Sequence, residues 1–562
     1  MENSTVRTLL AITGLVFFLP VLSAQEPLQR KWWVEFTDKN NSPFCTCRPA
    51  SFLSARALER RARAGIAVEE NDLPVNPAYV QALKDAGAQL HSTSRWMNAA
   101  TVIADSASAM RLTQFPFVRK VQYLGPDIPL RNPPNRPAKK RAPVAESPVV
   151  RGESSVFGYA GMQNSLLGVP FLYAAGHRGA GIWVAVMDGG FLHADTLPFF
   201  DRAAREGRLF QGWDFVEHDS AVYESAVHGM AVLSLMAADL PGYFVGTAPE
   251  ATYFLIKTED TGGEFPVEEA NWVAGAEWAD SIGADMINAS LGYTVFNDST
   301  LNYPYADLNG HSRIGSRGAA IAASKGMIVC NSAGNSGDDP WPWIGVPADA
   351  PGVIAVGAVR ADEKRASFSS TGPSADGRIK PDLVAPGEMI VVAGENGTDL
   401  SLSSGTSLAA PMLTGAIASL WSAFPKRPAA EILDAVFQSA DQAANPDVLR
   451  GYGLPDLARA WLSLGGYLHG NAFNNAGPGL FAFDRMAGTF SFLLFMPSSE
   501  PVAEAELFNA LGERIPVGPV EWHSESVSAL IVSQMQALPP GFYSMRIRTR
   551  SGAFWLAGLA WR

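Results

Sequence analysis

The chain has 562 residues, several times the length of an ordinary domain, so more than one structural unit is expected. Apolar residues make up 47% and charged residues 17%, which allows large buried cores and excludes a broadly disordered protein. The net charge of −12 lacks the basic excess of a typical nucleic-acid binder, and 3 cysteines cannot build a disulfide framework. Composition therefore favours a large soluble globular protein, and motifs must indicate its function.

Residues 1–24 have the pattern of a secretory signal peptide. Arg7 precedes an apolar run over 8–22, and small residues follow it up to Ala24. A membrane anchor is the alternative, but the run is shorter than the roughly 20 residues of a spanning helix and contains Pro20. We therefore expect cleavage after Ala24 and a secreted or cell-surface protein with no stable membrane span.

Residues 25–125 have the strand and helix pattern of a small α+β domain. The expected strands are 31–36, 99–104 and 118–123, and the expected helices are 54–65, 78–87 and 106–114. Cys45 and Cys47 are too close in the sequence for an easy disulfide, so we expect isolated thiols on a loop, with metal ligation as the alternative.

Residues 126–150 differ sharply in composition from the segments on either side. Seven prolines lie among five basic residues, which are Arg131, Arg136, Lys139, Lys140 and Arg141. Such a composition predicts an extended, exposed linker that proteases can reach easily.

Residues 151–464 alternate apolar strands with helices, a pattern typical of an α/β domain with a doubly wound parallel sheet. The expected strands are 182–187, 252–256, 285–289, 327–330 and 353–356, and the helices between them include 268–282 and 316–325. Cys330 ends one of these strands and is expected to pack as a small hydrophobic residue. In this architecture ligands bind beyond the carboxyl ends of the strands.

Residues 465–562 lose the helical pattern. Short alternating runs at 490–495, 504–509 and 544–548 are separated by Gly and Pro turns, which predicts a final β domain, a small sandwich.

Four polar residues of the α/β region occupy positions suited to chemistry. Asp188 directly follows a predicted strand, and His228 precedes an apolar helical run. Ser407 lies where a Gly-rich turn enters a helix, a position at which backbone N–H groups and the helix dipole favour an anion. Asn335, in a Gly-rich loop, could donate its amide to an oxyanion or be an ordinary turn residue. Each residue alone has a structural explanation, so only the set is informative.

Together these positions resemble the landmarks of the subtilase family, the subtilisin-like serine proteases. The matching segments, in chain order, are 184–190, 228–229, 288–292, 332–335, 368–373, 380–387 and 405–411. The order Asp, His, Ser is that of subtilisin. Two positions depart from the family: Met230 stands where Thr or Ser is common, and Leu408 replaces the usual Met. Neither departure removes a catalytic group.

The resemblance implies a serine endopeptidase mechanism. Ser407 would attack the peptide carbonyl, His228 would take its proton, and Asp188 would orient the histidine. Asn335 and the backbone N–H of Ser407 would stabilise the oxyanion. Residues implied to bind the substrate through backbone pairing are Ser290, Leu291, Gly292, Ser332, Ala333 and Gly334. For Ser290–Gly292 the alternative is a plain strand end.

Two other functions are weighed against this one. A non-catalytic relative should have lost one of the four polar residues, and all four are present. An esterase or lipase would need a Gly-x-Ser-x-Gly turn and the order Ser, acid, His, and the sequence around Ser407 shows neither.

The resemblance also assigns roles to the flanking regions. Residues 25–125 are similar to inhibitory propeptides in position and size, which implies a zymogen whose partners are its own propeptide and protein substrates; an unrelated N-terminal domain is the alternative. Residues 506–514 and 538–543 resemble a type IX secretion sorting domain that contacts export machinery. The chain ends in Ala-Trp-Arg and not in the usual Lys-rich strand, so a plain accessory β domain is the alternative. The chemistry needs no cofactor, no metal-ligand spacing stands out, and structural calcium is a family expectation only.

Overall fold

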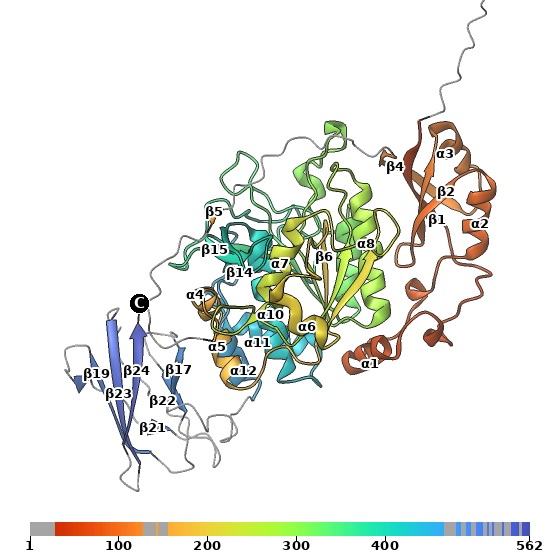
Figure 1. Ribbon diagram of the computed structural model, residues 1–562. Coiled ribbons are helices and arrows are strands. Elements are labelled where there is room, and N and C mark those ends of the chain that lie inside the picture. Colours follow the sequence, from red (N-terminus) through yellow and green to blue (C-terminus); the bar gives the residue numbers. More distant parts are fainter. Residues whose placement is uncertain are drawn as a thin grey trace, which may run out of the picture.

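The computed structural model describes residues 28–127 and 156–465 continuously, with the short strand 142–143 and eight strands between 479 and 561. The predicted signal peptide and most of the predicted linker lie outside the described residues. Figure 1 shows an N-terminal domain on one side of a central α/β domain, and the C-terminal strands on the other side.

The N-terminal domain contains an antiparallel sheet with the strand order β2-β3-β1-β4. The strands are β1 (Arg30–Phe36), β2 (Gln89–Ser94), β3 (Ala99–Ala104) and β4 (Val118–Pro126). Helices α2 (Pro77–Asp85) and α3 (Ser106–Leu112) begin at Asn76 and Asp105, whose side chains accept backbone N–H groups of the first turn. All the predicted elements of this domain are present. Strand β2 was not predicted, because its sequence, Gln-Leu-His-Ser-Thr-Ser, is mostly polar.

Helix α1 (Ala55–Ala64) extends away from this sheet along the central domain (Figure 1). It begins at Ser54, whose hydroxyl accepts the N–H of Ala57, and ends at Gly65, which has the left-handed φ of 67° that favours glycine. The residue before the helix already contacts the central domain, because the Ser54 N–H donates a hydrogen bond to the Ser281 carbonyl oxygen at 2.9 Å.

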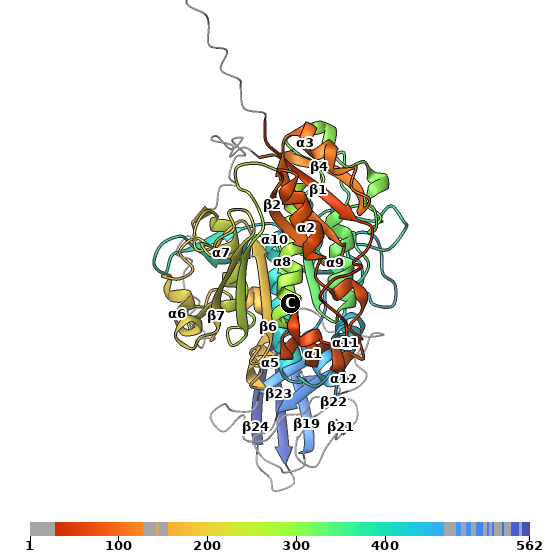
Figure 2. The ribbon, with the colours of Figure 1, turned by 90° about the vertical axis from the view of Figure 1, so that its right-hand side faces the viewer.

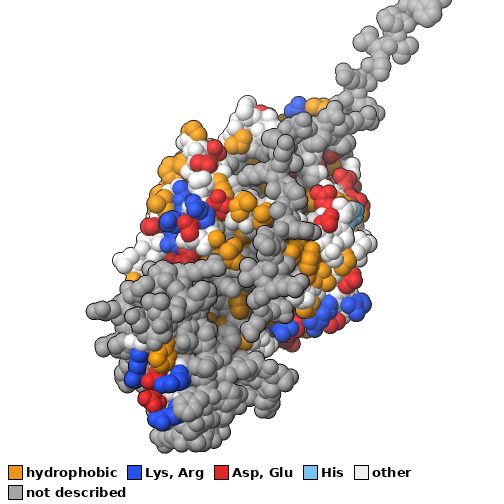
Figure 3. Space-filling model, turned by 60° about the vertical axis from the view of Figure 1, so that its left-hand side comes forward, with side chains coloured by type: hydrophobic (Ala, Val, Ile, Leu, Met, Phe, Trp, Pro, Cys, Tyr) orange, Lys and Arg blue, Asp and Glu red, His pale blue; other side chains and the backbone are white. Residues whose placement is uncertain are grey.

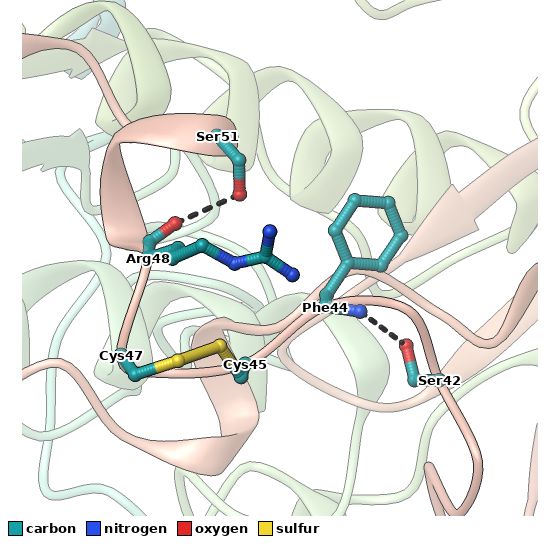
Figure 4. The surroundings of a disulfide bond; sticks show 6 residues. All are labelled: Ser42, Phe44, Cys45, Cys47, Arg48 and Ser51. Carbon is teal, nitrogen blue, oxygen red and sulfur yellow. Dashed lines mark hydrogen bonds between the residues drawn. A yellow bond between two sulfur atoms is a disulfide. The ribbon is translucent and has the colours of Figure 1, made fainter.

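The prediction of isolated thiols in the N-terminal domain is wrong. Cys45 and Cys47 form a disulfide, and their Cα atoms lie 5.2 Å apart, within the usual range for such a bond. The intervening turn brings the two side chains to the same side of the chain. Figure 4 shows hydrogen bonds on both sides of it, from the Phe44 N–H to Ser42 and from the Ser51 hydroxyl to the Arg48 carbonyl.

The central domain contains a seven-stranded sheet with the order β14-β13-β12-β11-β6-β10-β7, in which every pair is parallel. Its strands are β6 (Trp183–Asp188), β7 (Leu209–Asp214), β10 (Thr252–Lys257), β11 (Met286–Ala289), β12 (Ile328–Ser332), β13 (Val353–Val359) and β14 (Leu383–Pro386). The inner strands are buried on both faces, which explains their unbroken apolar sequences. Cys330 is buried in β12 as predicted. Edge strand β7 was not predicted because most of its residues are partly or fully exposed.

Helices cover both faces of this sheet. Helices α8 (Val267–Ile282) and α9 (Ile314–Ser324) pack on one face, and α7 (Val227–Ala237) and α10 (Thr406–Ser422) pack on the other. The remaining elements are α4 (Gly161–Ser165), α5 (Val169–Ala174), α6 (Asp201–Arg205), α11 (Ala429–Ser439), α12 (Leu457–Ser463), β5 (Ala142–Pro143), β8 (Asp239–Leu240), β9 (Phe244–Val245), β15 (Ile390–Ala393) and β16 (Leu400–Ser403). The predicted doubly wound α/β fold is therefore present.

The N-terminal sheet lies against α8 and α9, as Figure 2 shows. Trp33 and Leu124 of the sheet share one apolar core with Trp272 of α8 and Ala319 of α9. The opposite face of the sheet packs against α2 and α3 around Val34. The two domains are thus joined through a continuous buried interface.

The C-terminal strands form a four-stranded antiparallel sheet with the order β20-β19-β23-β24 and two strand pairs, β17-β18 and β21-β22. They are β17 (Gly479–Asp484), β18 (Ser491–Phe495), β19 (Val502–Asn509), β20 (Arg514–Ile515), β21 (Val520–Glu521), β22 (Ile531–Val532), β23 (Gly541–Thr549) and β24 (Phe554–Trp561). Figure 3 shows acidic and basic side chains together on this sheet, where Arg546 and Arg514 pair with Glu506. The β content agrees with the sequence, and a sandwich stays a prediction. In the described parts of the chain, no helix has the length and apolar character needed to cross a membrane.

Candidate active site

Asp188 and His228 meet at the carboxyl end of the central sheet. Asp188 is the last residue of β6 and is 2% exposed, and its Oδ1 also accepts the N–H of Gly189 at 2.8 Å. His228 is the second residue of α7, and its Nδ1 lies 2.9 Å and 3.0 Å from the two oxygens of Asp188. The carboxylate therefore holds the imidazole by Nδ1 and turns Nε2 away from the sheet.

Gly229 permits this close approach of α7 to β6. A Cβ at this position would lie 2.2 Å from the Gly190 carbonyl oxygen and 2.9 Å from the Cβ of Asp188. Because backbone atoms cannot yield to such a contact, a larger residue would push the helix and its histidine away from the carboxylate. The His-Gly pair in the sequence therefore has a packing reason.

Ser407 is the second residue of α10 and lines the same cleft as Asp188 and His228. Gly405 precedes the helix as its cap, and a Cβ on Gly405 would lie 2.9 Å from the Ser407 Oγ and 3.8 Å from the Asn335 Nδ2. The hydroxyl and the amide nitrogen therefore flank one small space above the glycine. The first-turn N–H groups of α10 begin at the same place.

Asn335 is oriented by Thr406, a residue to which the sequence assigned no role. The Asn335 Oδ1 accepts hydrogen bonds from the Thr406 N–H at 2.8 Å and the Thr406 hydroxyl at 3.1 Å. The Thr406 hydroxyl oxygen also accepts the N–H of Gly334 at 3.0 Å. With its oxygen occupied in this way, the amide presents its N–H₂ group to the side of Ser407. The only sequence signal for Thr406 was its place beside Ser407.

The six residues predicted to bind substrate all line this cleft, whose volume is about 590 Å³. Ser290–Gly292 follow β11, and Ser332–Gly334 come at the end of β12, so they border the cleft from neighbouring strands. The Ser290 hydroxyl donates to the Ser407 carbonyl at 2.7 Å, and the Leu291 carbonyl accepts from the Asn331 amide at 2.9 Å. These bonds fix the two segments to α10 and to each other.

A group of carboxylates forms one wall of the cleft, which the sequence did not predict. Glu259, Asp260, Glu264 and Glu268 line it together with Asp188. Burial raises the pKa of Glu259 to about 8, and the pKa of Glu268 is also raised, first by burial and then by the charge of Glu259. These residues come from the loop after β10 and the start of α8, where no motif marked them.

No metal site accompanies this wall in the portion of the chain that the structure describes. No three His, Cys, Asp or Glu side chains there are grouped so that they could hold an ion. Because calcium also takes backbone and amide carbonyl oxygens, structural calcium stays an expectation from the resemblance.

Two family sequence models match the chain. The Subtilase family matches residues 179–454, and the Peptidase S8 propeptide domain of Bacteroidota matches residues 31–141. Subtilisin DY of Bacillus licheniformis is 31% identical over 269 residues, which cover 48% of this chain and 86% of the relative. Subtilisin of Bacillus pumilus is 31% identical over 280 residues, covering 49% and 90%. Subtilisin E of Bacillus subtilis (strain 168) is also 31% identical, over 50% of this chain but 66% of its own length, just under two thirds.

The chain therefore belongs to the subtilase family of serine-type endopeptidases. It carries an S8 propeptide domain in its N-terminal region, as a zymogen does.

Proposed function

We propose that the chain is a secreted serine endopeptidase that hydrolyses peptide bonds in proteins after release from its propeptide. The observation that carries the proposal is the meeting of Asp188, His228, Ser407 and Asn335 at one cleft of a subtilase domain. Each of these side chains comes from a different element, so their meeting is a property of the fold and not of the local sequence.

The geometry supports an acyl-transfer mechanism. The Ser407 hydroxyl attacks the scissile carbonyl carbon while His228 takes its proton, and His228 then delivers that proton to the leaving amine. Asp188 holds the tautomer with the proton on Nδ1 and stabilises the imidazolium. The Asn335 amide and the Ser407 N–H donate hydrogen bonds to the oxyanion. Water then repeats the attack on the acyl-enzyme.

The substrate is proposed to lie in extended form between two segments of the cleft border. Ser290–Gly292 form no ladder with any described strand, so their backbone groups are placed to pair with a peptide. Ser332–Gly334, at the end of the neighbouring strand, line the same cleft next to Asn335. Backbone pairing of this kind binds many sequences, and the side-chain pockets then set the preference.

The flanking regions fit an exported zymogen. Residues 1–24 serve as a signal peptide, the propeptide domain blocks the cleft until the linker at 126–150 is cut, and a C-terminal sorting domain engages type IX export machinery. N-terminal sequencing of the active secreted protein tests the propeptide role, because a start near Gln25 would show that active enzyme keeps this domain.

The replacement Ser407→Ala tests the catalytic assignment. It should abolish peptide hydrolysis and labelling by serine-directed organophosphates, with a loss on the order of a millionfold in turnover as for the nucleophile of subtilisin, a relative. Ser403→Ala, in β16 just before the turn, is the matched control and should retain both properties. Labelling that survives in Ser407→Ala would contradict the assignment.

The replacement Asn335→Ala tests the oxyanion role. Because it removes one donor that acts only on the transition state, kcat should fall roughly 100- to 1,000-fold with little change in KM, the loss known for the corresponding donor of subtilisin. Thr406 positions this donor, so Thr406→Val should lower kcat by a smaller factor. A change in KM alone would show that Asn335 binds substrate in its ground state.

A further inference from the structure

Apart from His228, the titratable side chains of the described chain that line the cleft are all carboxylic acids. Its lining includes five carboxylates, those of Asp188, Glu259, Asp260, Glu264 and Glu268, and no Lys or Arg from the described part of the chain. Asp188 is held by His228, and both oxygens of Glu268 accept backbone N–H groups of the loop, from Asp260 and Phe265. Asp188 and Glu268 are thus accounted for by the proposed mechanism and by the loop structure.

Glu259 is placed differently, beside the reacting groups. A Cβ on Gly189, the residue after Asp188, would lie 3.6 Å from the Cβ of Glu259 and 3.6 Å from that of Ala226, close to His228 in the chain. The Oε1 of Glu259 accepts hydrogen bonds from the Tyr293 hydroxyl at 2.6 Å and the Thr258 hydroxyl at 2.8 Å. Among the described residues, no donor reaches its Oε2. The carboxyl is therefore fixed by one oxygen on the His228 side of the cleft.

The surroundings of Glu259 favour a positive partner. Burial raises its pKa to about 8, and the negative charges of Glu264 and Asp188 act in the same direction. A raised pKa means that ionising this carboxyl costs free energy. A cation entering the cleft would lower that cost, because an opposite charge near a carboxyl favours its ionised form. A neutral side chain would leave the cost unchanged.

Resting on the proposed peptidase function, we propose that Glu259 is a specificity-determining residue that selects Lys or Arg in the substrate, at a position next to the scissile bond on the His228 side. The basic side chain lies along the acidic wall and donates to the free oxygen of Glu259. The carboxyl does not touch the reacting atoms, so it affects the choice of substrate and not the chemical step.

The chain itself carries a basic sequence directly after a residue that contacts this wall. Gly125, at the end of β4, is in contact with Phe265 of the acidic loop, because a Cβ there would lie 2.9 Å from the Phe265 Cβ. The N-terminal domain therefore ends beside the wall, and the next 25 residues in the sequence contain five basic side chains and two acidic ones. The complementary charges favour this linker as the first substrate.

The experiment compares peptides that differ only by Arg or Gln at one position, which is moved along both sides of the bond that is cut. The unaltered mature enzyme should prefer Arg at one position by on the order of ten- to a hundredfold in kcat/KM, the range of a hydrogen bond to a charged group. In Glu259→Gln the Arg-to-Gln ratio should fall toward one at that position only. Glu431→Gln, an exposed carboxylate far along the chain in α11, is the matched control.

A second variant leaves Glu259 itself unchanged, so the test does not depend on whether Glu259→Gln folds. Thr261 is exposed on the cleft wall near Gly189, and Thr261→Lys supplies a cation that should compete with the substrate for Glu259 and lower the ratio. The preference should also rise between pH 6 and 9 as Glu259 ionises. An Arg-to-Gln ratio that is the same in all variants would overturn this inference and leave the peptidase function standing. Loss of all Ser407-dependent hydrolysis in the unaltered enzyme would overturn both.

Discussion

The two ends of helix α8 carry carboxylates in opposite situations. Glu268 near its start belongs to the cleft wall, which has no described Lys or Arg beside it. Asp280 near its end is fully buried and pairs with Arg60, Arg61 and Arg95 of the N-terminal domain. Arginines of the N-terminal domain therefore pair with the carboxylate near one end of the helix, while the carboxylate near the other end lines the cleft that is proposed to bind substrate.

This contrast separates a contact within the chain from a proposed recognition site. At the interface, Asp285 also pairs with Arg56 and Arg63, and a guanidinium stacks on Trp183 with Arg56 lying 4.3 Å from the ring centre. Buried ion pairs tolerate no missing partner, because a lone buried charge is costly. The interface is thus stabilised by complete ion pairs, whereas Glu259 at the cleft has one oxygen that no donor from the described residues reaches and that suits the proposed cation.

The largest expected effect comes from breaking the interface at its centre. Asp280→Asn leaves three arginines without their shared counter-charge, so the free energy of unfolding of the N-terminal domain should fall by about 3–5 kcal/mol. Denaturant titration in a Ser407→Ala background measures this without self-digestion. Glu431→Gln breaks an exposed pair with Arg427 and should cost under about 0.5 kcal/mol. Equal losses of unfolding free energy in the two variants would show that the buried ion pairs of the interface contribute no more than an exposed pair.

The sequence predicted the cleft far better than the interface. Asp188, His228, Asn335 and Ser407 could be found because reaction chemistry restricts each position to one residue type next to small neighbours such as Gly229 and Gly405. No motif marked the interface arginines, since a local pattern does not tell which surface a second domain will cover. Glu259 was missed for a related reason: a carboxylate in a loop has no pattern until the fold places it beside Asp188. The Cys45–Cys47 bond depends on turn geometry that spacing alone does not give.

A smaller effect is expected where the interface contains a histidine pair. His91 of β2 has its Nδ1 2.8 Å from the Nε2 of His218 in the central domain, and its Nε2 lies 3.0 Å from the Asn271 Oδ1. A neutral chain satisfies this geometry, with His218 donating to His91 and His91 donating to Asn271. Burial lowers the pKa of His91 to about 3, helped by Lys31, and burial also lowers that of His218.

The sign of the pH effect follows from these lowered values. The histidine pair binds a proton more weakly in the docked state than in the free domain. Its contribution to docking is therefore complete above about pH 6.5 and is lost as the pH falls below that value. The carboxylates of Asp214 and Glu217 face His218 and offset only part of the lowering of its pKa. At pH 5 docking should weaken by about 2 kcal/mol, roughly thirtyfold in dissociation constant. Gel filtration of the linker-cut Ser407→Ala protein at pH 7 and pH 5 measures this, and His91→Gln should reduce the difference; retention that does not depend on pH would contradict it.

Removing the titratable carboxyl at the cleft has an effect of the opposite sign to the loss at the interface. The folded-state pKa of Glu259 is raised to about 8, so the folded protein holds a proton there that the unfolded chain releases near its ordinary value. The stabilisation from this carboxyl is therefore complete at low pH and is lost as the pH rises toward and through 8. Glu259→Gln cannot ionise, so its Tm relative to the unaltered protein should increase by a few degrees, roughly, from pH 5 to pH 9. Differential scanning calorimetry in the Ser407→Ala background tests this. A Tm that falls with pH in the variant as steeply as in the parent would show that Glu259 already has a cation within the folded chain.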